Sequence, residues 1–210
     1  MIKANSVGGA PSTGISLNIR CPCCGQLGTF EPLAANSSDF IVDGGIRIGE
    51  RRCPNLTCRT MLFVVWQNNS VARSYPALRI DFDKTNIPSP VVSALGEAIT
   101  CHANECFIAA AIMVRKTLEE LCRERGAQGK DLRGRIRDLG TKIVLPKELL
   151  DGLDDLRLLG NDAAHIESRE YDQVGKDEVE IGIEFTKEVL KATYQYSALL
   201  NRLRSLKKIP

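Results

Sequence analysis

The chain has 210 residues, of which 43% are hydrophobic and 26% are charged, and its formal net charge at pH 7 is +2. This length suits one domain, or a small domain followed by a medium one, and the apolar content suffices for a core. The nearly balanced charge excludes a strongly basic protein, so nucleic-acid binding would need a local cluster of lysine and arginine.

The start of the chain lacks the apolar run of a signal peptide. No stretch approaches the roughly 20 apolar residues that a membrane-spanning helix needs. We therefore expect a soluble, cytoplasmic protein with no membrane partner. Eight cysteines in such a protein are expected to be reduced thiols or metal ligands rather than disulfides.

Residues 1–18 are rich in Gly, Ser, Pro and Ala, which predicts a flexible tail. The segment SLNIR then predicts a short strand that leads into the first cysteines. Further along, FIVDGGIRIGERR is typical of a hairpin, and TMLFVVWQN predicts another strand. Phe63 and Trp66 of this strand are expected in the core, which leaves base stacking on aromatic side chains poorly supported.

Two cysteine-containing turns give the strongest chemical signal in the sequence. They are CPCCG, which begins at Cys21, and CPNLTC, which begins at Cys53. Each turn places two thiolates on one side, and two such turns complete the tetrahedron that Zn²⁺ prefers. The spacing favours the four ligands Cys21, Cys24, Cys53 and Cys58, with Cys23 as an alternative to Cys21 or Cys24.

Four thiolates would fill the coordination sphere of zinc and leave no position for water, so the predicted zinc is structural. Residues 19–75 are therefore predicted to form a zinc-ribbon β module that metal binding helps to fold. Residues 76–89 contain prolines and little regular pattern, which predicts an extended connector.

Residues 90–208 show apolar positions that recur at steps of three and four, as in packed helices. Helices are predicted over about residues 90–103, 105–125, 131–140, 146–165 and 176–207. The last helix is expected to bury Phe185, Val189, Ala192, Tyr196, Leu199 and Leu203. Three cysteines in helical sequence, Cys101, Cys106 and Cys122, are interpreted as small core residues. The predicted fold is α+β, mainly α, with about five helices in a bundle.

The segment RLLGNDAAH, residues 157–165, carries three polar residues at helical spacing. If it stays helical, Arg157, Asn161 and His165 point from one face. Such a set would suit metal-independent RNA cleavage, because imidazole can move a proton while guanidinium and amide groups stabilise the phosphorane. The alternative is structural: Asn161 follows Gly160 as in many helix ends, and His165 can bond to a carbonyl oxygen.

Two other groups of charged residues lie in the helical region. Arg115 and Glu119, from RKTLE, form an i,i+4 pair that we interpret as a half-buried anchor between helices. A basic cluster, interleaved with acidic residues, could contact RNA phosphates or could form an ordinary solvated face. It consists of Lys130, Arg133, Arg135 and Arg137.

The CPxCG turn, the YP…IP connector, RKTLE and RLLGNDAAH with a long last helix together resemble a bacterial domain of unknown function. That domain occurs alone and attached to type I restriction subunits. It is grouped with the HEPN superfamily (higher eukaryotes and prokaryotes nucleotide-binding), and the resemblance covers roughly residues 20–205. It implies a HEPN-like bundle, a homodimer formed through that bundle, RNA or a nucleic-acid-processing protein as partner, and a role in restriction or phage defence.

In HEPN ribonucleases the motif is an arginine, a polar residue and, after several spacers, a histidine. Asn161 and His165 match the last two positions, whereas Gly160 stands where active members have arginine and Arg157 lies one turn earlier. The resemblance therefore favours a nucleic-acid-associated binding or assembly module. The alternatives are a metal-independent endoribonuclease with a dimeric Arg/Asn/His site and a protein-interaction module without nucleic-acid affinity.

Overall fold

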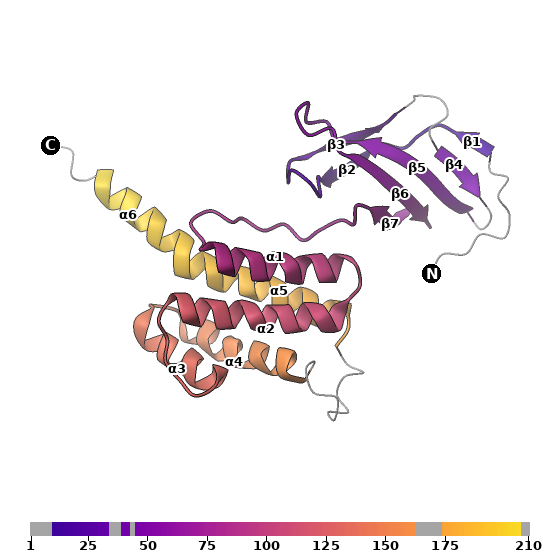
Figure 1. Ribbon diagram of the computed structural model, residues 1–210. Coiled ribbons are helices and arrows are strands. Elements are labelled where there is room, and N and C mark those ends of the chain that lie inside the picture. Colours follow the sequence, from indigo (N-terminus) through magenta and orange to yellow (C-terminus); the bar gives the residue numbers. More distant parts are fainter. Residues whose placement is uncertain (1–9, 34–38, 43–44, 163–173, 207–210) are drawn as a thin grey trace. The chain divides into compact units, whose positions relative to one another are not determined.

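The computed structural model describes residues 10–33, 39–42, 45–162 and 174–206 (Figure 1). The chain divides into two compact units, Met1–Asp81 and Phe82–Pro210. The first unit is an antiparallel sheet and the second is helical. The predicted α+β fold with a helical C-terminal part is therefore confirmed.

One curled sheet of seven strands makes up the described part of the first unit. Strand β5 pairs with β6 along one edge, and with β4 and then β3 along the other. The first strand lies within the stretch that we expected to be a tail, and it pairs with β4. The strands are β1 (Ala10–Ser12), β2 (Leu17–Arg20), β3 (Leu27–Pro32), β4 (Asp39–Val42), β5 (Ile46–Arg52), β6 (Met61–Gln67) and β7 (Ser70–Tyr75).

The two faces of the sheet differ in burial. Strand β6 alternates strictly, with Leu62, Val64 and Trp66 in the core beside Phe30 of β3. Trp66 is 5% exposed, as expected, but Phe63 is 50% exposed, so its predicted place in the core is wrong. Because successive side chains of a strand point to opposite faces, residues three positions apart cannot share one.

A buried ion pair ties the chain before β2 to the sheet. Both terminal nitrogens of Arg51 donate to the carboxylate of Asp39, each at 2.8 Å, and both side chains are fully buried. The Arg51 Nε donates to the carbonyl oxygen of Ile15 at 2.6 Å, and its guanidinium lies 4.5 Å from the centre of the Trp66 ring. Gly49 leaves room for this pair, since a Cβ there would overlap the Asp39 carboxylate.

Burial is the largest single influence on the pKa of Asp39 and would raise it. The hydrogen bonds and charge of Arg51, with smaller contributions from the Ile15 N–H and Arg47, together outweigh burial and hold this pKa below its usual value. The carboxylate is therefore charged at neutral pH. A bidentate arginine pair of this kind satisfies both oxygens of a buried carboxylate.

The second unit holds five helical segments in its described residues, counting the last three elements as one long helix. None of the described helices is long and apolar enough to cross a membrane. The elements are α1 (Ser89–Ala103), α2 (Phe107–Glu124), α3 (Leu132–Lys142), α4 (Lys147–Asp162), α5 (Lys176–Leu190), the π-helix η3 (Lys191–Gln195) and α6 (Tyr196–Leu206).

Helix α2 is central to the unit and packs against α1, α4 and α5. Its Ala110, Ala111, Val114, Leu118 and Leu121 are buried, which matches the apolar periodicity of the sequence. Cysteines of this region differ in burial: Cys122 is buried, Cys101 is half-buried and Cys106 is exposed. The core assignment of Cys106 is wrong because this residue precedes α2, in the turn from α1.

The π-helix η3 changes which face of the long C-terminal helix is apolar. Its wider turn takes up one more residue than an α-helical turn. Apolar residues that keep their spacing in the sequence therefore point to a different side of the helix after η3. Arg125 of the turn after α2 stabilises η3: it donates to the carbonyl oxygen of Thr193 at 2.9 Å and lies 4.2 Å from the centre of the Tyr194 ring.

The predicted burial of the last helix is correct for Val189 and wrong beyond η3. Leu199 is 61% exposed and Leu203 is 53% exposed, and none of the described residues of α6 is buried. Figure 1 shows α6 continuing α5 past the ends of α1 and α2. Within the part of the chain that the structure describes, the large apolar side chains of α6 are therefore not covered by the bundle.

Candidate metal centre and other candidate sites

The four predicted cysteines meet at one end of the sheet. The Sγ atoms of Cys21 and Cys58 are 3.8 Å apart and those of Cys24 and Cys53 are 3.9 Å apart. All four sulfurs lie within 4.8 Å of one another. A tetrahedron with Zn–S bonds of about 2.3 Å has sulfurs about 3.8 Å apart, so the spacing fits zinc. Iron accepts the same four-sulfur geometry, so the cluster could hold a metal ion and suits zinc without excluding iron.

The first cysteine turn is the hairpin between β2 and β3. Gly25 has a φ of +75°, a conformation that side chains disfavour, and its N–H donates to the carbonyl oxygen of Cys21 at 2.9 Å. Arg20 donates to the carbonyl oxygen of Gly25 at 2.8 Å. This tight turn brings Cys21 and Cys24 to the same side of the chain.

The second turn connects β5 to β6. The side-chain oxygen of Asn55 accepts a hydrogen bond from the N–H of Thr57 at 2.9 Å, which shapes the turn between Cys53 and Cys58. The N–H of Cys53 donates to the carbonyl oxygen of Thr60 at 2.9 Å and closes the loop. The four residues between Cys53 and Cys58 therefore form a compact, hydrogen-bonded loop.

The cysteines differ in how readily they form thiolates. Burial raises the pKa of Cys53 to about 12 and also raises the pKa of Cys21. The hydroxyl of Thr60, 3.1 Å from the Cys58 sulfur, lowers the pKa of Cys58 to about 6. A bound cation favours the thiolate form of all of them, because its charge compensates for burial.

Cys23, the alternative ligand, lies outside this four-sulfur cluster of the described residues, and it is exposed. Of the two possibilities left by the sequence, the geometry favours Cys21 and Cys24 as the pair supplied by the first turn.

Residues of the two helical motifs approach each other between α2 and α4. Arg115 lies 3.5 Å from Glu119 and donates to the carbonyl oxygen of Arg157 at 3.4 Å. The Arg157 guanidinium in turn donates to Asp154 at 2.8 Å, and Arg133 of α3 lies 3.6 Å from the same carboxylate. Arg115 and Glu119 are half-buried, and Arg115 contacts the neighbouring helix α4, which suits a structural anchor.

The other two members of the predicted polar set are not placed. Asn161 lies in the last turn of α4, but its side chain is outside the described residues, and so is His165. The described part of the set is Arg157, whose guanidinium already pairs with Asp154. The Arg/Asn/His site therefore stays a prediction.

The predicted basic cluster is divided by the helical turn of α3. Arg133 and Arg137 line one cavity together with Asp151 and Asp154, whereas Arg135 lines another with Lys116 and Glu119. Lys130 precedes the helix. The four cations thus do not form one uniformly basic surface.

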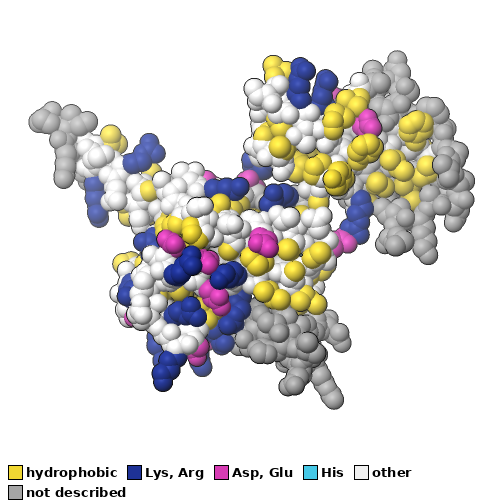
Figure 2. All heavy atoms as spheres, in the orientation of Figure 1, with side chains coloured by type: hydrophobic (Ala, Val, Ile, Leu, Met, Phe, Trp, Pro, Cys, Tyr) yellow, Lys and Arg dark blue, Asp and Glu magenta, His cyan; other side chains and the backbone are white. Residues whose placement is uncertain are grey.

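Sequence reasoning missed the outward face of the sheet. Phe40 pairs with Ile48 across β4 and β5, and Phe63 pairs with Tyr75 across β6 and β7, so these side chains share a face. All four are exposed, and Figure 2 shows hydrophobic side chains gathered on the visible surface of the first unit. We call this surface the aromatic face. It consists of Phe40, Ile48, Glu50, Arg52, Met61, Phe63, Val65, Arg73 and Tyr75, with Glu31 of β3 opposite Arg52. The alternation of β6 was the signal that could have identified it.

A family model described as "Domain of unknown function (DUF4145)" matches residues 96–208, which is more than half of the chain. The match begins within α1 and leaves the cysteine cluster outside. No curated protein and no solved structure matches the chain. What the cysteine cluster and the aromatic face can bind therefore follows from their own chemistry.

Proposed function

This chain belongs to the family described as domain of unknown function DUF4145, and we propose that it is a zinc-stabilised module that binds single-stranded nucleic acid. The observation that carries the proposal is the aromatic face. Its exposed rings and arginines lie on one face of a sheet whose cysteine turns could be held together by a metal ion.

The metal belongs to the scaffold. Four sulfurs at tetrahedral spacing would hold Zn²⁺ with no position left for water, which is the arrangement of structural rather than catalytic zinc. The two cysteine turns and the antiparallel strands between them support a zinc-ribbon module. In such a module the metal would hold β2, β3, β5 and β6 together at the end where the turns meet.

The aromatic face offers what single strands need. Every base has a π-face that can stack on an exposed ring, and arginines can contact the phosphates between stacked bases. Phe63 and Tyr75 lie opposite each other on adjacent strands, and the exposed Arg73 lies two residues before Tyr75. RNA is the polymer that the HEPN resemblance implies.

The basic cluster of α3 is the weaker candidate for this contact. Arg133 pairs with Asp154, and Asp151 lines the same cavity, so the local charge is mixed. The aromatic face also carries Glu31 and Glu50 beside its arginines, so its exposed rings, rather than an excess of cations, make it the stronger candidate. The HEPN-like bundle, its homodimer and the role in restriction or phage defence are proposals that rest on the resemblance.

The test is RNA binding by variants of the aromatic face. Fluorescence anisotropy with a labelled single-stranded RNA at low salt should show that Phe63→Ala with Tyr75→Ala weakens binding by about tenfold or more, since each stacked base contributes about 1–3 kcal/mol. Phe63→Tyr keeps the ring and should retain affinity, which separates stacking from general disruption of the sheet.

A matched pair of cation variants distinguishes the two surfaces. Arg133→Gln with Arg137→Gln should leave RNA affinity nearly unchanged, whereas Arg52→Gln with Arg73→Gln should weaken it. If the α3 variant weakened RNA binding and the aromatic-face variant did not, the RNA contact would instead be assigned to α3. Absence of RNA binding by the wild-type protein even at low salt would support the protein-interaction alternative.

A further inference from the structure

Helix α6 carries an unpartnered apolar face, which we call the α6 stripe. Its residues follow helical spacing, and all of them are exposed. The exposed Arg202 and Arg204 accompany the stripe, and α6 contains no acidic residue. The stripe consists of Tyr196, Leu199, Leu200, Leu203 and Leu206. A surface of this kind marks a protein or membrane contact.

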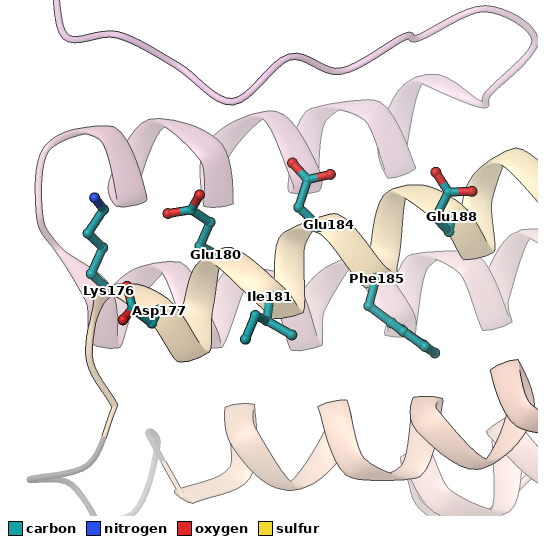
Figure 3. A pocket seen from close by; sticks show the side chains of 7 residues that line it. All are labelled: Lys176, Asp177, Glu180, Ile181, Glu184, Phe185 and Glu188. Carbon is teal, nitrogen blue, oxygen red and sulfur yellow. The ribbon is translucent and has the colours of Figure 1, made fainter.

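A groove of about 800 Å³ runs along α5 and has the opposite charge. Ile181, 70% exposed, and Phe185 give it an apolar floor. Figure 3 shows Glu180, Glu184 and Glu188 in a row on one side of α5, with Ile181 and Phe185 pointing to the other side. Helix α5 carries five acidic residues and two lysines, a net charge of −3, against +2 for α6.

Some of these carboxylates already have lysine neighbours. Lys187 lies 2.7 Å from Glu184, and Lys191 lies 3.6 Å from Glu188. Exposed i,i+3 pairs of this kind contribute little free energy, so they would not prevent the carboxylates from meeting an arginine.

The α6 stripe cannot reach the α5 groove of its own chain. Helices α5 and α6 belong to one unbroken helix from Lys176 to Leu206, so the groove and the stripe lie one after the other along the same axis. A helical wheel that allows for the extra residue of η3 places both on the side away from the residues that α5 buries. The groove is therefore open to the stripe of another copy.

We propose that two copies of the chain pair their long C-terminal helices antiparallel, so that the α6 stripe of each copy occupies the α5 groove of the other. The two-fold axis passes near Ala192, one residue after the midpoint of Lys176–Leu206. Leu199 then lies near Phe185, and Leu203 near Ile181, of the second copy. Arg204 comes within reach of the carboxylate row. The inference rests on the homodimer included in the proposed function, and it assigns the surface through which that dimer forms.

The first test measures mass in solution by light scattering and sedimentation. The wild-type chain should be a dimer, and Leu199→Asp with Leu203→Asp should weaken dimerisation on the order of 100-fold because two central apolar contacts are lost. Both side chains are exposed in the single chain, so the circular dichroism spectrum and melting temperature of the monomer should be retained. Val144→Asp, at another fully exposed apolar residue, is the matched control and should remain dimeric.

A charge exchange tests which surfaces meet. Arg202→Glu with Arg204→Glu makes α6 acidic, and Glu180→Arg with Glu184→Arg makes the groove basic. Each double variant should be monomeric alone, because like charges would face each other at both contacts. A mixture of the two should form a heterodimer, because both contacts then join opposite charges.

Three results would overturn the inference: a monomeric wild type, a dimer unaffected by the leucine variants, or a groove variant that still forms a dimer by itself. Capture of the monomer on anionic vesicles through α6 would assign the stripe to a membrane surface instead. RNA binding is measured on the same variants. If the wild-type chain is a monomer that still binds RNA through the aromatic face, the dimer proposal fails and the RNA-binding proposal stands.

Discussion

At the residue scale, the pair formed by Asp39 and Arg51 shows how a charged group can be part of a sheet core. The cost of burying the two charges is offset because their polar groups are hydrogen-bonded. Both carboxylate oxygens of Asp39 accept from Arg51, and the Nε of Arg51 donates to the carbonyl oxygen of Ile15. Removing one partner would leave the other charge buried and unpaired, which is far more destabilising than losing an exposed pair.

We therefore expect Asp39→Ala to lower the free energy of unfolding of the first unit by about 3–5 kcal/mol. Asp81→Ala, which removes the exposed partner of Arg20 at 3.2 Å, should cost at most about 1 kcal/mol. Urea unfolding with metal present measures both. Because folding depresses the pKa of Asp39, the pair stabilises fully above the unfolded-state pKa and its contribution is lost as pH falls through the folded-state pKa, so neutral pH is appropriate. Equal effects of the two variants would contradict this account.

At the scale of elements, one glycine marks where an aromatic ring of α5 packs on α4. A Cβ on Gly152 of α4 would overlap the ring of Phe185 on α5, whereas a Cβ on Gly96 of α1 would meet no atom within 4 Å. The ring of Phe185 is also part of the α5 groove. Packing of α4 on α5 and the shape of the groove therefore depend on the same glycine.

Two glycine-to-alanine variants separate helix propensity from packing. Gly96→Ala should stabilise the protein by about 0.5–1 kcal/mol, since alanine favours a helix and the site has room. Gly152→Ala gains the same propensity but must displace Phe185, so its net effect should be a loss of about 1 kcal/mol or more. Thermal unfolding followed at the helical signal compares them. A stabilising Gly152→Ala would show that the ring moves away without cost.

How much the sequence revealed also depends on the element. The helices and the cysteine turns could be predicted because their signals are local: a period of three and four, and two thiolates within one turn. The predicted burial of Phe63 was wrong because both faces of its strand carry apolar side chains. Only the pairing with neighbouring strands shows which of the two faces points outward. Leu199 and Leu203 were misplaced because the apolar period continues along α6 although this helix extends past the ends of α1 and α2, which the sequence cannot show. The alternation of β6 gave a signal for its own outward side chains, but the full aromatic face also requires the order of β4, β5, β6 and β7.

At the scale of the whole molecule, the two units have cores of different origin. The core of the first unit is small and includes the candidate metal ligands Cys21 and Cys53, whereas the core of the second consists of helix contacts around α2. A β module of this size gains much of its stability from a bound metal. The two units should therefore respond differently when the metal is removed.

Treatment with a strong chelator should unfold the first unit and leave the helical circular dichroism signal nearly unchanged. Near-ultraviolet signal or fluorescence from Trp66, a core residue of the first unit, reports its loss. Cys53→Ser should have the same effect and should bind less than half an equivalent of zinc, whereas Cys23→Ser should keep a full equivalent. Simultaneous loss of both units on chelation would contradict independent cores.

The extra residue in η3 also sets the rotational phase of α6 relative to the bundle. Each residue of an α-helix advances about 100°, so inserting one residue directly after Gln195 in α-helical geometry would turn the whole of α6 by roughly that angle. Deleting one residue within η3 would instead convert its wider turn into an α-helical turn and leave the direction of α6 unchanged. In the insertion variant the bundle before η3 would be left as it is, yet Leu199 and Leu203 would face a different side of the long helix. A single insertion at this point could therefore change which partner a member of the family accepts while leaving its fold intact.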